Sequence, residues 1–381
     1  MKLLCLCSAL DLKFRYGCTP AWWQFFKGLH ELGHDVIAVP YQGAAIESPW
    51  WRVYRNPCQW EGAGFAAAKR LFARKATSLS AGGGASRKLV ETWIRPRWEK
   101  HIASILEAER DVAAVIIFTI PVNHLTGVPQ RLRGRFNVPF FYYDGDVPAS
   151  LPRFSGYASG FRIYEEADLS EYDGVLCNSE GGADDLVQMG AKRVEVVHWG
   201  VDPDLYTPLE IEQDRDVFCY GFGAEYRAPW LEAMVVEPSR ILEDCRFAVG
   251  GRRFKADLGR AECVGDVPFN AFRQACCRSR INLNITRQAH ASVFASSSMR
   301  PFELAAMGCC VVSNPYNGIE TWFDLERDVL VVNSVGEAVA AYRRLLGDEA
   351  ARRAMGESAR QRVLDCHTHR HRAAQIAQFV A

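Results

Sequence analysis

The stretch that decides the fold is residues 3–39, which reads LLCLCSALDLKFRYGCTPAWWQFFKGLHELGHDVIAV. Residues 3–10 form an apolar run typical of a buried strand, and apolar residues recur at helical spacing through 20–33. A second apolar strand follows at 36–39. This order predicts the strand–helix–strand unit of a doubly wound parallel sheet, with the turn at Gly17 on the carboxyl edge where such sheets bind ligands.

The same alternation of short apolar runs and helical patterns continues along the chain. Further strands are expected at 113–118, 139–143, 174–177, 194–199, 217–220, 246–249, 281–285, 309–313 and 329–332. The stretch GVDPDLYTP at 200–208 interrupts this pattern with two prolines and predicts a domain boundary. The expected fold is therefore α/β, with two tandem Rossmann-like, doubly wound domains and a cleft between them.

Length and composition agree with a soluble two-domain protein. The chain has 381 residues, more than one core usually supports, and its 49% hydrophobic and 24% charged residues are typical of folded proteins. Forty-five basic and 45 acidic residues give no net charge, which argues against nucleic acid as a partner. The thirteen cysteines include no C-x-x-C pair of the kind that binds zinc, so we expect reduced thiols in a cytoplasmic protein. No apolar run is long enough for a membrane span, and we expect no signal peptide.

One segment is strongly basic. Between Lys69 and Lys100, nine basic residues stand against two acidic ones. This pattern fits either a solvated face or a patch for an anionic acceptor or a membrane surface, so membrane contact is expected to be at most peripheral.

The strongest chemical signal is SSSMRPFELAAMG at 296–308. Small hydroxyl residues lead into a helix whose first position is expected at Pro301, and the N–H groups at a helix start attract phosphate. Glu303, one turn into the helix, could accept hydrogen bonds from two sugar hydroxyls. The alternative is that Arg300 and Glu303 form a surface ion pair beside a core helix. The residues expected around the phosphates are Ser298, Met299 and Arg300, whose guanidinium can make a forked contact.

Two glycine-containing turns repeat this chemistry. In YGFGAEYR at 220–227, Gly221 and Gly223 would let the backbone approach a diphosphate, and Arg227 can reach its charge. The stretch GGRRFK at 250–255 offers Arg252 and Lys255 at the next strand end, unless it is a plain turn.

Together these stretches resemble a known family. The quoted motifs, with LHELGHDV at 29–36, the helix at 178–190, HWGVDP at 198–203, NGIE at 317–320 and HTHR at 367–370, resemble glycosyltransferases of the GT-B fold. The likeness is to the nucleotide-sugar-dependent family four and its spore-maturation-type relatives among the group 1 glycosyl transferases.

The resemblance implies a division of labour between the domains. Residues 1–200, joined by a returning helix at 367–381, would form the acceptor domain, and residues 201–366 the nucleotide-sugar donor domain. A donor with a UDP, GDP or TDP base and a small-molecule, glycan or protein acceptor would be the partners, with no further cofactor. The resemblance implies that Glu303 contacts the ribose, and that Arg227 with Arg252 or Lys255 contacts the diphosphate. It places His124 near the donor sugar, unless that histidine is merely structural. The residues implied at the sugar or acceptor are Gly17, Asn317, Gly318 and Glu320.

One departure from the family affects the mechanism. The family has a first carboxylate eight residues before Glu303, where this chain has Ala295. Retention of anomeric configuration, which the resemblance implies, is therefore in doubt. Inverting transfer, sugar-nucleotide epimerisation and non-catalytic binding of a sugar nucleotide remain alternatives.

A metal or pyridoxal phosphate would indicate other chemistries. Asp144-Gly145-Asp146 matches the Asp-x-Asp of metal-dependent glycosyltransferases, but the arginines and the helix start at 296–308 make a metal redundant. We therefore expect no metal, and Asp146 would be an acceptor-side base or sugar contact. Phosphorolysis with pyridoxal phosphate needs a lysine in the second domain, where Lys255 stands alone without a helix to present it.

Overall fold

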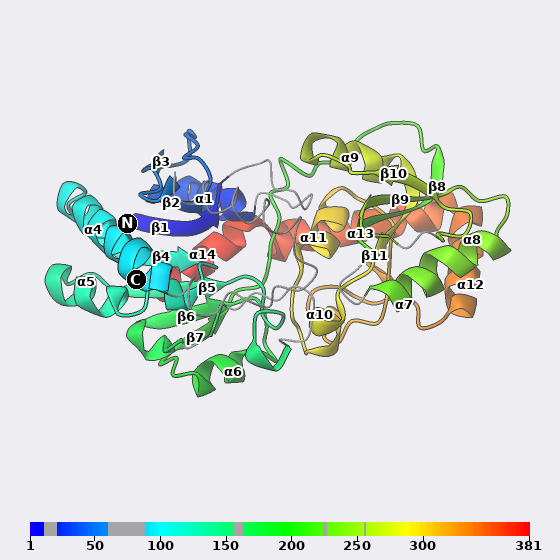
Figure 1. Ribbon diagram of the computed structural model, residues 1–381. Coiled ribbons are helices and arrows are strands. Elements are labelled where there is room, and N and C mark those ends of the chain that lie inside the picture. The colour runs from blue at the N-terminus through cyan, green and yellow to red at the C-terminus, as the bar shows by residue number, and fades with distance from the viewer. Residues whose placement is uncertain (11–20, 60–87, 155–162, 166, 224–226, 255–256) are drawn as a thin grey trace.

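The computed structural model describes residues 1–381 except 11–20, 60–87, 155–162, 166, 224–226 and 255–256. The described chain forms two parallel sheets that lie end to end, each flanked by helices (Figure 1). Most of the basic segment 69–100, together with Gly17 and Lys255, lies outside the described residues.

The first sheet has the strand order β3-β2-β1-β4-β5-β6-β7, and all its strand pairs are parallel. Its strands are β1 (Lys2–Ala9), β2 (Asp35–Gln42), β3 (Arg52–Val53), β4 (Val112–Phe118), β5 (Phe140–Asp144), β6 (Gly174–Cys177) and β7 (Val194–Val196). β1 pairs with β2 on one side and β4 on the other, with Leu4 opposite both Ile37 and Val115. The chain order reverses between β1 and β4, as predicted for a doubly wound sheet.

Alternate side chains of β1 enter two separate cores. Leu3 and Cys5 pack in the core that contains Phe25 of α1, whereas Leu4 and Leu6 pack in the core on the other face. Burial on both faces explains why β1 is a continuous apolar run.

The second sheet has the order β10-β9-β8-β11-β12-β13 and is also parallel. Its strands are β8 (Arg215–Phe222), β9 (Phe247–Arg252), β10 (Glu262–Gly265), β11 (Ser279–Asn284), β12 (Val311–Ser313) and β13 (Leu330–Val331). The order reverses between β8 and β11. The short strands β3 and β10 are not among the predicted elements.

Helices connect the strands. They are α1 (Ala21–Glu31), η1 (Val90–Ile94), α4 (Arg95–Ala108), η2 (Val122–His124), α5 (Val128–Phe136), η3 (Pro152–Phe154), η4 (Leu169–Glu171), α6 (Ala183–Gln188), α7 (Ala228–Leu231), η5 (Glu232–Val236), α8 (Glu237–Ile241), α9 (Phe269–Cys277), α10 (Gln288–Ser292), α11 (Met299–Ala306), η6 (Ile319–Thr321), α12 (Val335–Gly347), α13 (Glu349–Cys366) and α14 (His369–Val380).

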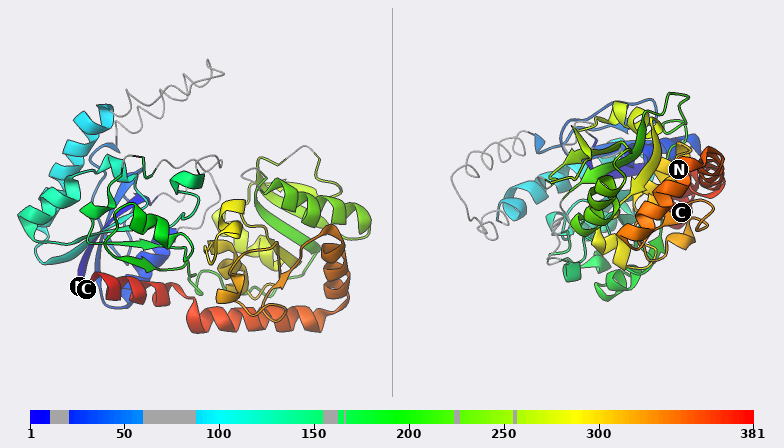
Figure 2. Two further views of the ribbon diagram at one scale, coloured as in Figure 1. Left: turned by 90° about the horizontal axis from the view of Figure 1, so that it is seen from below. Right: turned by 90° about the vertical axis from the view of Figure 1, so that its right-hand side faces the viewer.

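The chain crosses between the two sheets twice, and the two crossings pair with each other. The Val201 amide donates to the His367 carbonyl at 3.1 Å, and the His369 amide donates to the Val201 carbonyl at 2.8 Å. After the second crossing, α14 packs against α1 of the first sheet, where a Cβ on Gly28 would lie 2.9 Å from the Ala373 side chain. Figure 2 shows α13 and α14 running along one side of both halves, with the two chain ends close together.

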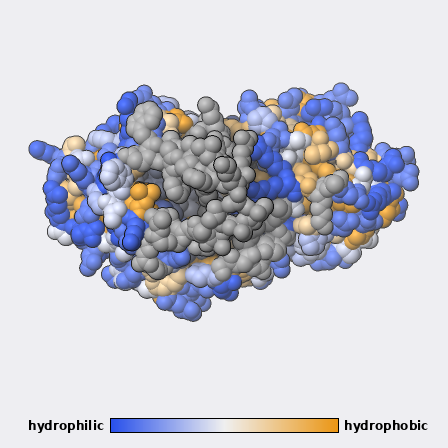
Figure 3. Space-filling view, viewed as in Figure 1, coloured by the Kyte–Doolittle hydropathy of each residue, from blue (hydrophilic) through white to orange (hydrophobic). Residues whose placement is uncertain are grey.

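The described part of the face drawn in Figure 3 is mainly hydrophilic. In Figure 3 apolar residues occur in small separate groups. None of the described helices is both long and apolar enough to cross a membrane, and every cysteine that the structure describes is a free thiol.

Candidate active site

The carboxyl ends of the two sheets meet in a hydrogen-bonded seam. The segment after β6 pairs with the loop before α11: the Ser297 amide donates to the Asn178 carbonyl at 2.8 Å, and the Asn178 side-chain amide donates to the Ser297 carbonyl at 2.7 Å. The hydroxyls of Ser179 and Ser296 lie 2.6 Å apart in the same seam. Because these groups are fully buried, the seam fixes the loop before α11 against the first sheet.

The helix start predicted as a phosphate site lies beside this seam. α11 begins at Met299, with Ser298 as its extended N-cap residue, so the prediction of Pro301 as the first helical position was wrong by two residues. The Ser298 side chain does not cap the helix. The Tyr316 hydroxyl, which donates to the Ser296 carbonyl, holds the approach to α11 from the opposite side.

Arg300 and Glu303 form an ion pair with an Nη1–Oε2 distance of 2.8 Å. The Glu303 side chain is 1% exposed and the Arg300 side chain 23% exposed, so the pair is half-buried rather than a surface pair. The Glu303 carboxylate also accepts a 3.3 Å hydrogen bond from Tyr206, and the Arg300 guanidinium lies 4.2 Å from the centre of the Phe272 ring. Burial raises the pKa of Glu303.

Arg227 follows β8 at the point where the strand order of the second sheet reverses. Its Nε donates to the carbonyl of Ile285, just beyond β11, at 3.0 Å. In this family of sheets, ligands bind at such a reversal. Gly223 has a packing role, since a Cβ there would lie 2.5 Å from the Phe254 Cα, whereas a Cβ on Gly221 would meet nothing within 4 Å.

Arg252 is engaged elsewhere. Its Nη2 and Nε contact the carboxylate of Asp266, and about half of each side chain is exposed. Arg252 is therefore paired with a carboxylate of the same half, and Lys255 lies outside the described residues.

The two aspartates after β5 have different environments. Asp144 is fully buried and accepts hydrogen bonds from Ser150 and from Tyr164, the latter at 2.6 Å. Burial raises its pKa to about 6. Asp146 instead faces the second sheet, where it pairs with Arg287. The two carboxylates of the Asp-x-Asp motif thus point to different partners, and the described residues contain no group of three or more potential ligands for a metal.

Arg287 and His290 are functional candidates that the sequence reasoning missed. Arg287 is the N-cap residue of α10, a helix of only five residues, and His290 lies within that helix. His290 is 2% exposed, and its Nε2 lies 3.4 Å from Arg287 Nη2 and 3.8 Å from the nearest Asp146 oxygen. The signal that could have found Arg287 is its place directly after β11, the strand end neighbouring that of β8.

His124 lies in η2 and is held within the first domain. Its Nδ1 is 2.6 Å from the Tyr41 hydroxyl, and burial together with the nearby Arg95 lowers its pKa to about 4. The Tyr41 ring stacks on Trp98 at 5.2 Å, so the partners that position His124 belong to the α4 side of the first sheet. These contacts favour the structural alternative.

Asn317 and Gly318 support the loop that carries Ala295. The Ala295 amide donates to the Asn317 carbonyl at 3.0 Å, and a Cβ on Gly318 would lie 2.4 Å from the Ala295 nitrogen. Ala295 is fully buried, so the position where the family has its first carboxylate is occupied by packed backbone. Glu320 is exposed, on η6.

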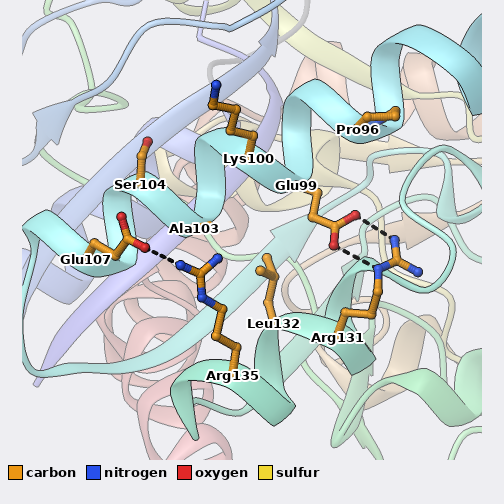
Figure 4. A pocket seen from close by; sticks show the side chains of 9 residues that line it. All are labelled: Pro96, Glu99, Lys100, Ala103, Ser104, Glu107, Arg131, Leu132 and Arg135. Atoms are coloured by element: carbon orange, nitrogen blue, oxygen red, sulfur yellow. Dashed lines mark hydrogen bonds and ion pairs between the residues drawn. The ribbon is translucent and has the colours of Figure 1, made fainter.

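A separate groove lies between α4 and α5, far from the seam (Figure 4). Its volume is about 550 Å³, and ion pairs between Arg131 and Glu99 and between Arg135 and Glu107 cross it. These neutralised charges do not make the groove a phosphate site.

The comparisons with known proteins agree with this arrangement. Residues 227–378 match the family described as glycosyl transferase-like. Sucrose-phosphate synthase from Thermosynechococcus elongatus superposes with a TM-score of 0.66 at 16% identity, covering 100% of this chain and 98% of that one. The chain has the GT-B fold.

Two other GT-B structures have the same extent. A glycosyltransferase from Rickettsia africae has a TM-score of 0.61 at 12% identity and covers 100% and 97% of the two chains. Anabaena HepE, in complex with UDP and glucose, has a TM-score of 0.62 at 10% identity and covers 100% and 99%. At these identities the structures establish only the fold that this chain shares with them. No curated protein sequence matches the chain.

Proposed function

We propose that this GT-B-fold protein is a glycosyltransferase, which moves a sugar from a nucleoside-diphosphate donor to a hydroxyl or amine of an acceptor, at the junction of the two sheets and without a metal. The observation that carries the proposal is the position of Arg227, which bridges the ends of β8 and β11 at the reversal of the second sheet. The start of α11 adds further positive potential near the seam.

This arrangement suits the chemistry of a nucleoside-diphosphate leaving group. Breaking the sugar–phosphate bond leaves growing negative charge on the diphosphate, and positive groups fixed in advance stabilise that charge. The complex of HepE with UDP and glucose, and an Escherichia coli structure bound with UDP-2-fluoro glucose, support a donor of this class.

The donor domain is proposed as the half built on β8–β13, and the acceptor domain as the half built on β1–β7 with α14. Asp146 is the acceptor-side group that the proposal favours, because it reaches the junction from β5. We propose retention as the stereochemical outcome. Inversion is the second candidate, favoured by the Asp146 carboxylate opposite the arginines and by the buried Ala295. NMR of the anomeric proton in the first-formed product distinguishes the two.

The first test is a thermal-shift screen with UDP, GDP, TDP, CDP and ADP, because a ligand that binds only the native state raises its stability. At least one of the five should raise the melting temperature. The sugar nucleotide with the matching base is then incubated with and without candidate acceptors, and release of nucleoside diphosphate is measured. A wild-type protein that none of the five stabilises would contradict the proposed function, and an epimerised donor without transfer would indicate the epimerase alternative.

A further inference from the structure

One ion pair joins the two halves at the proposed site. Arg287, directly after β11, pairs with Asp146, directly after β5. The two side chains are only 19% and 16% exposed. Since the residues lie 141 positions apart and belong to different sheets, this contact reports on how the two halves meet.

Arg287 also lies in the cationic corner proposed for the diphosphate. It follows β11 and Arg227 follows β8, and these two strands are neighbours at the reversal of the second sheet. Arg287 Nη2 lies 3.4 Å from His290 Nε2, and Arg227 Nε donates to the carbonyl of Ile285, which closely precedes Arg287 in the chain. Burial, with a further contribution from both arginines, lowers the pKa of His290 well below its usual value.

His290 fixes the position of the guanidinium. With its depressed pKa the imidazole is neutral, so Nε2 can accept a hydrogen bond from Arg287 Nη2 at 3.4 Å. In that tautomer Nδ1 carries the proton, and Nδ1 has no hydrogen-bond partner among the described residues. A buried donor of this kind beside two arginines suits an anionic ligand.

We propose that Arg287 is a diphosphate-binding residue for which the donor and Asp146 compete. In the ligand-free protein Arg287 pairs with Asp146; when the diphosphate binds between Arg227 and α11, the guanidinium turns to the phosphate oxygens and releases the Asp146 carboxylate toward the acceptor side. This inference rests on the proposed function.

The competition follows from charge and geometry. A diphosphate offers more negative charge and more acceptor oxygens than one carboxylate, and arginine binds phosphate through two parallel N–H donors. The partly buried carboxylate of Asp146 holds the guanidinium in place until such a ligand arrives, because leaving a partly buried charge unpaired is costly. Removing the two partners of the pair should therefore change diphosphate affinity in opposite directions.

The experiment is a double-mutant cycle on the full-length protein, with affinity measured by calorimetry. The probes are inorganic pyrophosphate and the nucleoside diphosphate that gives the largest thermal shift. Asp146→Asn should bind both about 5-fold tighter than wild type, and Arg287→Gln about 10-fold or more weaker. When Arg287 is already replaced by Gln, Asp146→Asn should not raise the affinity for the diphosphate. If Asp146 acted only through the long-range effect of its charge, Asp146→Asn would still raise the affinity in that background.

Ser179→Ala is the matched control for loosening the seam. It removes a cross-sheet hydroxyl contact outside the arginine corner, so it should lower the melting temperature and leave diphosphate affinity within 2-fold. If either single variant fails to fold, the charge-exchanged pair Asp146→Arg with Arg287→Asp preserves the ion pair and should bind as weakly as Arg287→Gln.

The outcomes separate the two proposals. Absence of binding by the wild type would overturn the proposed function. If the wild type binds but Asp146→Asn binds no more tightly, only the competition is overturned. The same holds if Asp146→Asn raises the affinity by the same factor with and without Arg287. Wild-type affinity of the charge-exchanged pair would also overturn the competition.

Discussion

The Ser297 hydroxyl accepts a 2.9 Å hydrogen bond from the backbone amide of Trp199 and donates a 3.0 Å bond to the Asn178 carbonyl. One side chain of the second half thus satisfies two buried backbone groups of the first. Ser297→Ala leaves the buried Trp199 amide without this partner, whereas the Asn178 carbonyl keeps its bond from the Ser297 amide, and should destabilise the protein by about 1–3 kcal/mol. A melting temperature lower by several degrees is the expected result. Ser104→Ala, which removes an exposed hydroxyl on α4, is the control and should change the melting temperature little; equal effects of the two would contradict the role of the seam.

Arg227 and Arg252 provide a matched pair of arginine substitutions. Arg227→Met removes the guanidinium at the end of β8 and should weaken nucleoside-diphosphate binding by at least about 10-fold, as expected for a hydrogen bond to a charged group. Arg252→Met removes an exposed partner of Asp266 and should leave affinity within about 2-fold. Calorimetric titration measures both affinities. A loss of affinity larger than 2-fold for Arg252→Met would indicate that Arg252 also binds the diphosphate.

Gly318 tests the packing under Ala295. Its φ is +81°, and a Cβ would lie 2.4 Å from the Ala295 nitrogen, so Gly318→Ala requires the backbone to move. We expect a loss of about 2 kcal/mol or more in the free energy of unfolding. Gly134→Ala, in α5 with nothing within 4 Å of the new Cβ, should instead stabilise by about 0.5–1 kcal/mol. Denaturant unfolding of both variants checks the contrast, which an equally mild Gly318→Ala would refute.

The buried carboxyl of Asp144 predicts a pH dependence of stability. Its pKa is raised from 3.8 to about 6 by burial, so the folded state keeps a proton that the unfolded state has lost. Stability contributed by this group therefore falls as the pH rises from about 4 to about 6, by about 3 kcal/mol in total. Asp144→Asn should become more stable relative to wild type across that window. Thermal melts from pH 4 to 7 measure this, with exposed Asp111→Asn as the control; a constant difference between Asp144→Asn and wild type would contradict it.

Removal of metal ions tests the metal-free mechanism. Because arginines and a helix start stabilise the diphosphate in the proposal, dialysis against EDTA should leave the transfer rate within about 2-fold of the untreated enzyme. A rate lost on chelation and restored by added Mg²⁺ or Mn²⁺ would overturn that part of the proposal.

The sequence was informative wherever local pattern decides structure. Buried parallel strands are continuous apolar runs, so the strands beginning at Lys2, Val112 and Arg215 could be predicted to within a few residues. The short α10 could not, because five residues are too few to show a helical period. β3 and β10, of two and four residues, are similarly too short.

The candidate site residues also divide into those that a local sequence pattern indicates and those that depend on tertiary packing. Arg227 and Asp146 could be found because a residue after a strand end lies at the ligand edge of such a sheet. The burial of Arg300 against Phe272, and its pairing with Glu303, depends on packing between α9 and α11 that no local motif contains. The pairing of Asp146 with Arg287 requires the two halves to meet, so only the folded chain could show it.

Because α14 returns to the first sheet, α1 can complete its packing only after α14 has been made. α1 forms its contact with Ala373 only after α14 has been synthesised, so a nascent chain on the ribosome has an incomplete first domain until that helix is available. A stop codon before His369 would therefore expose the apolar face of α1, more than 330 residues away along the chain.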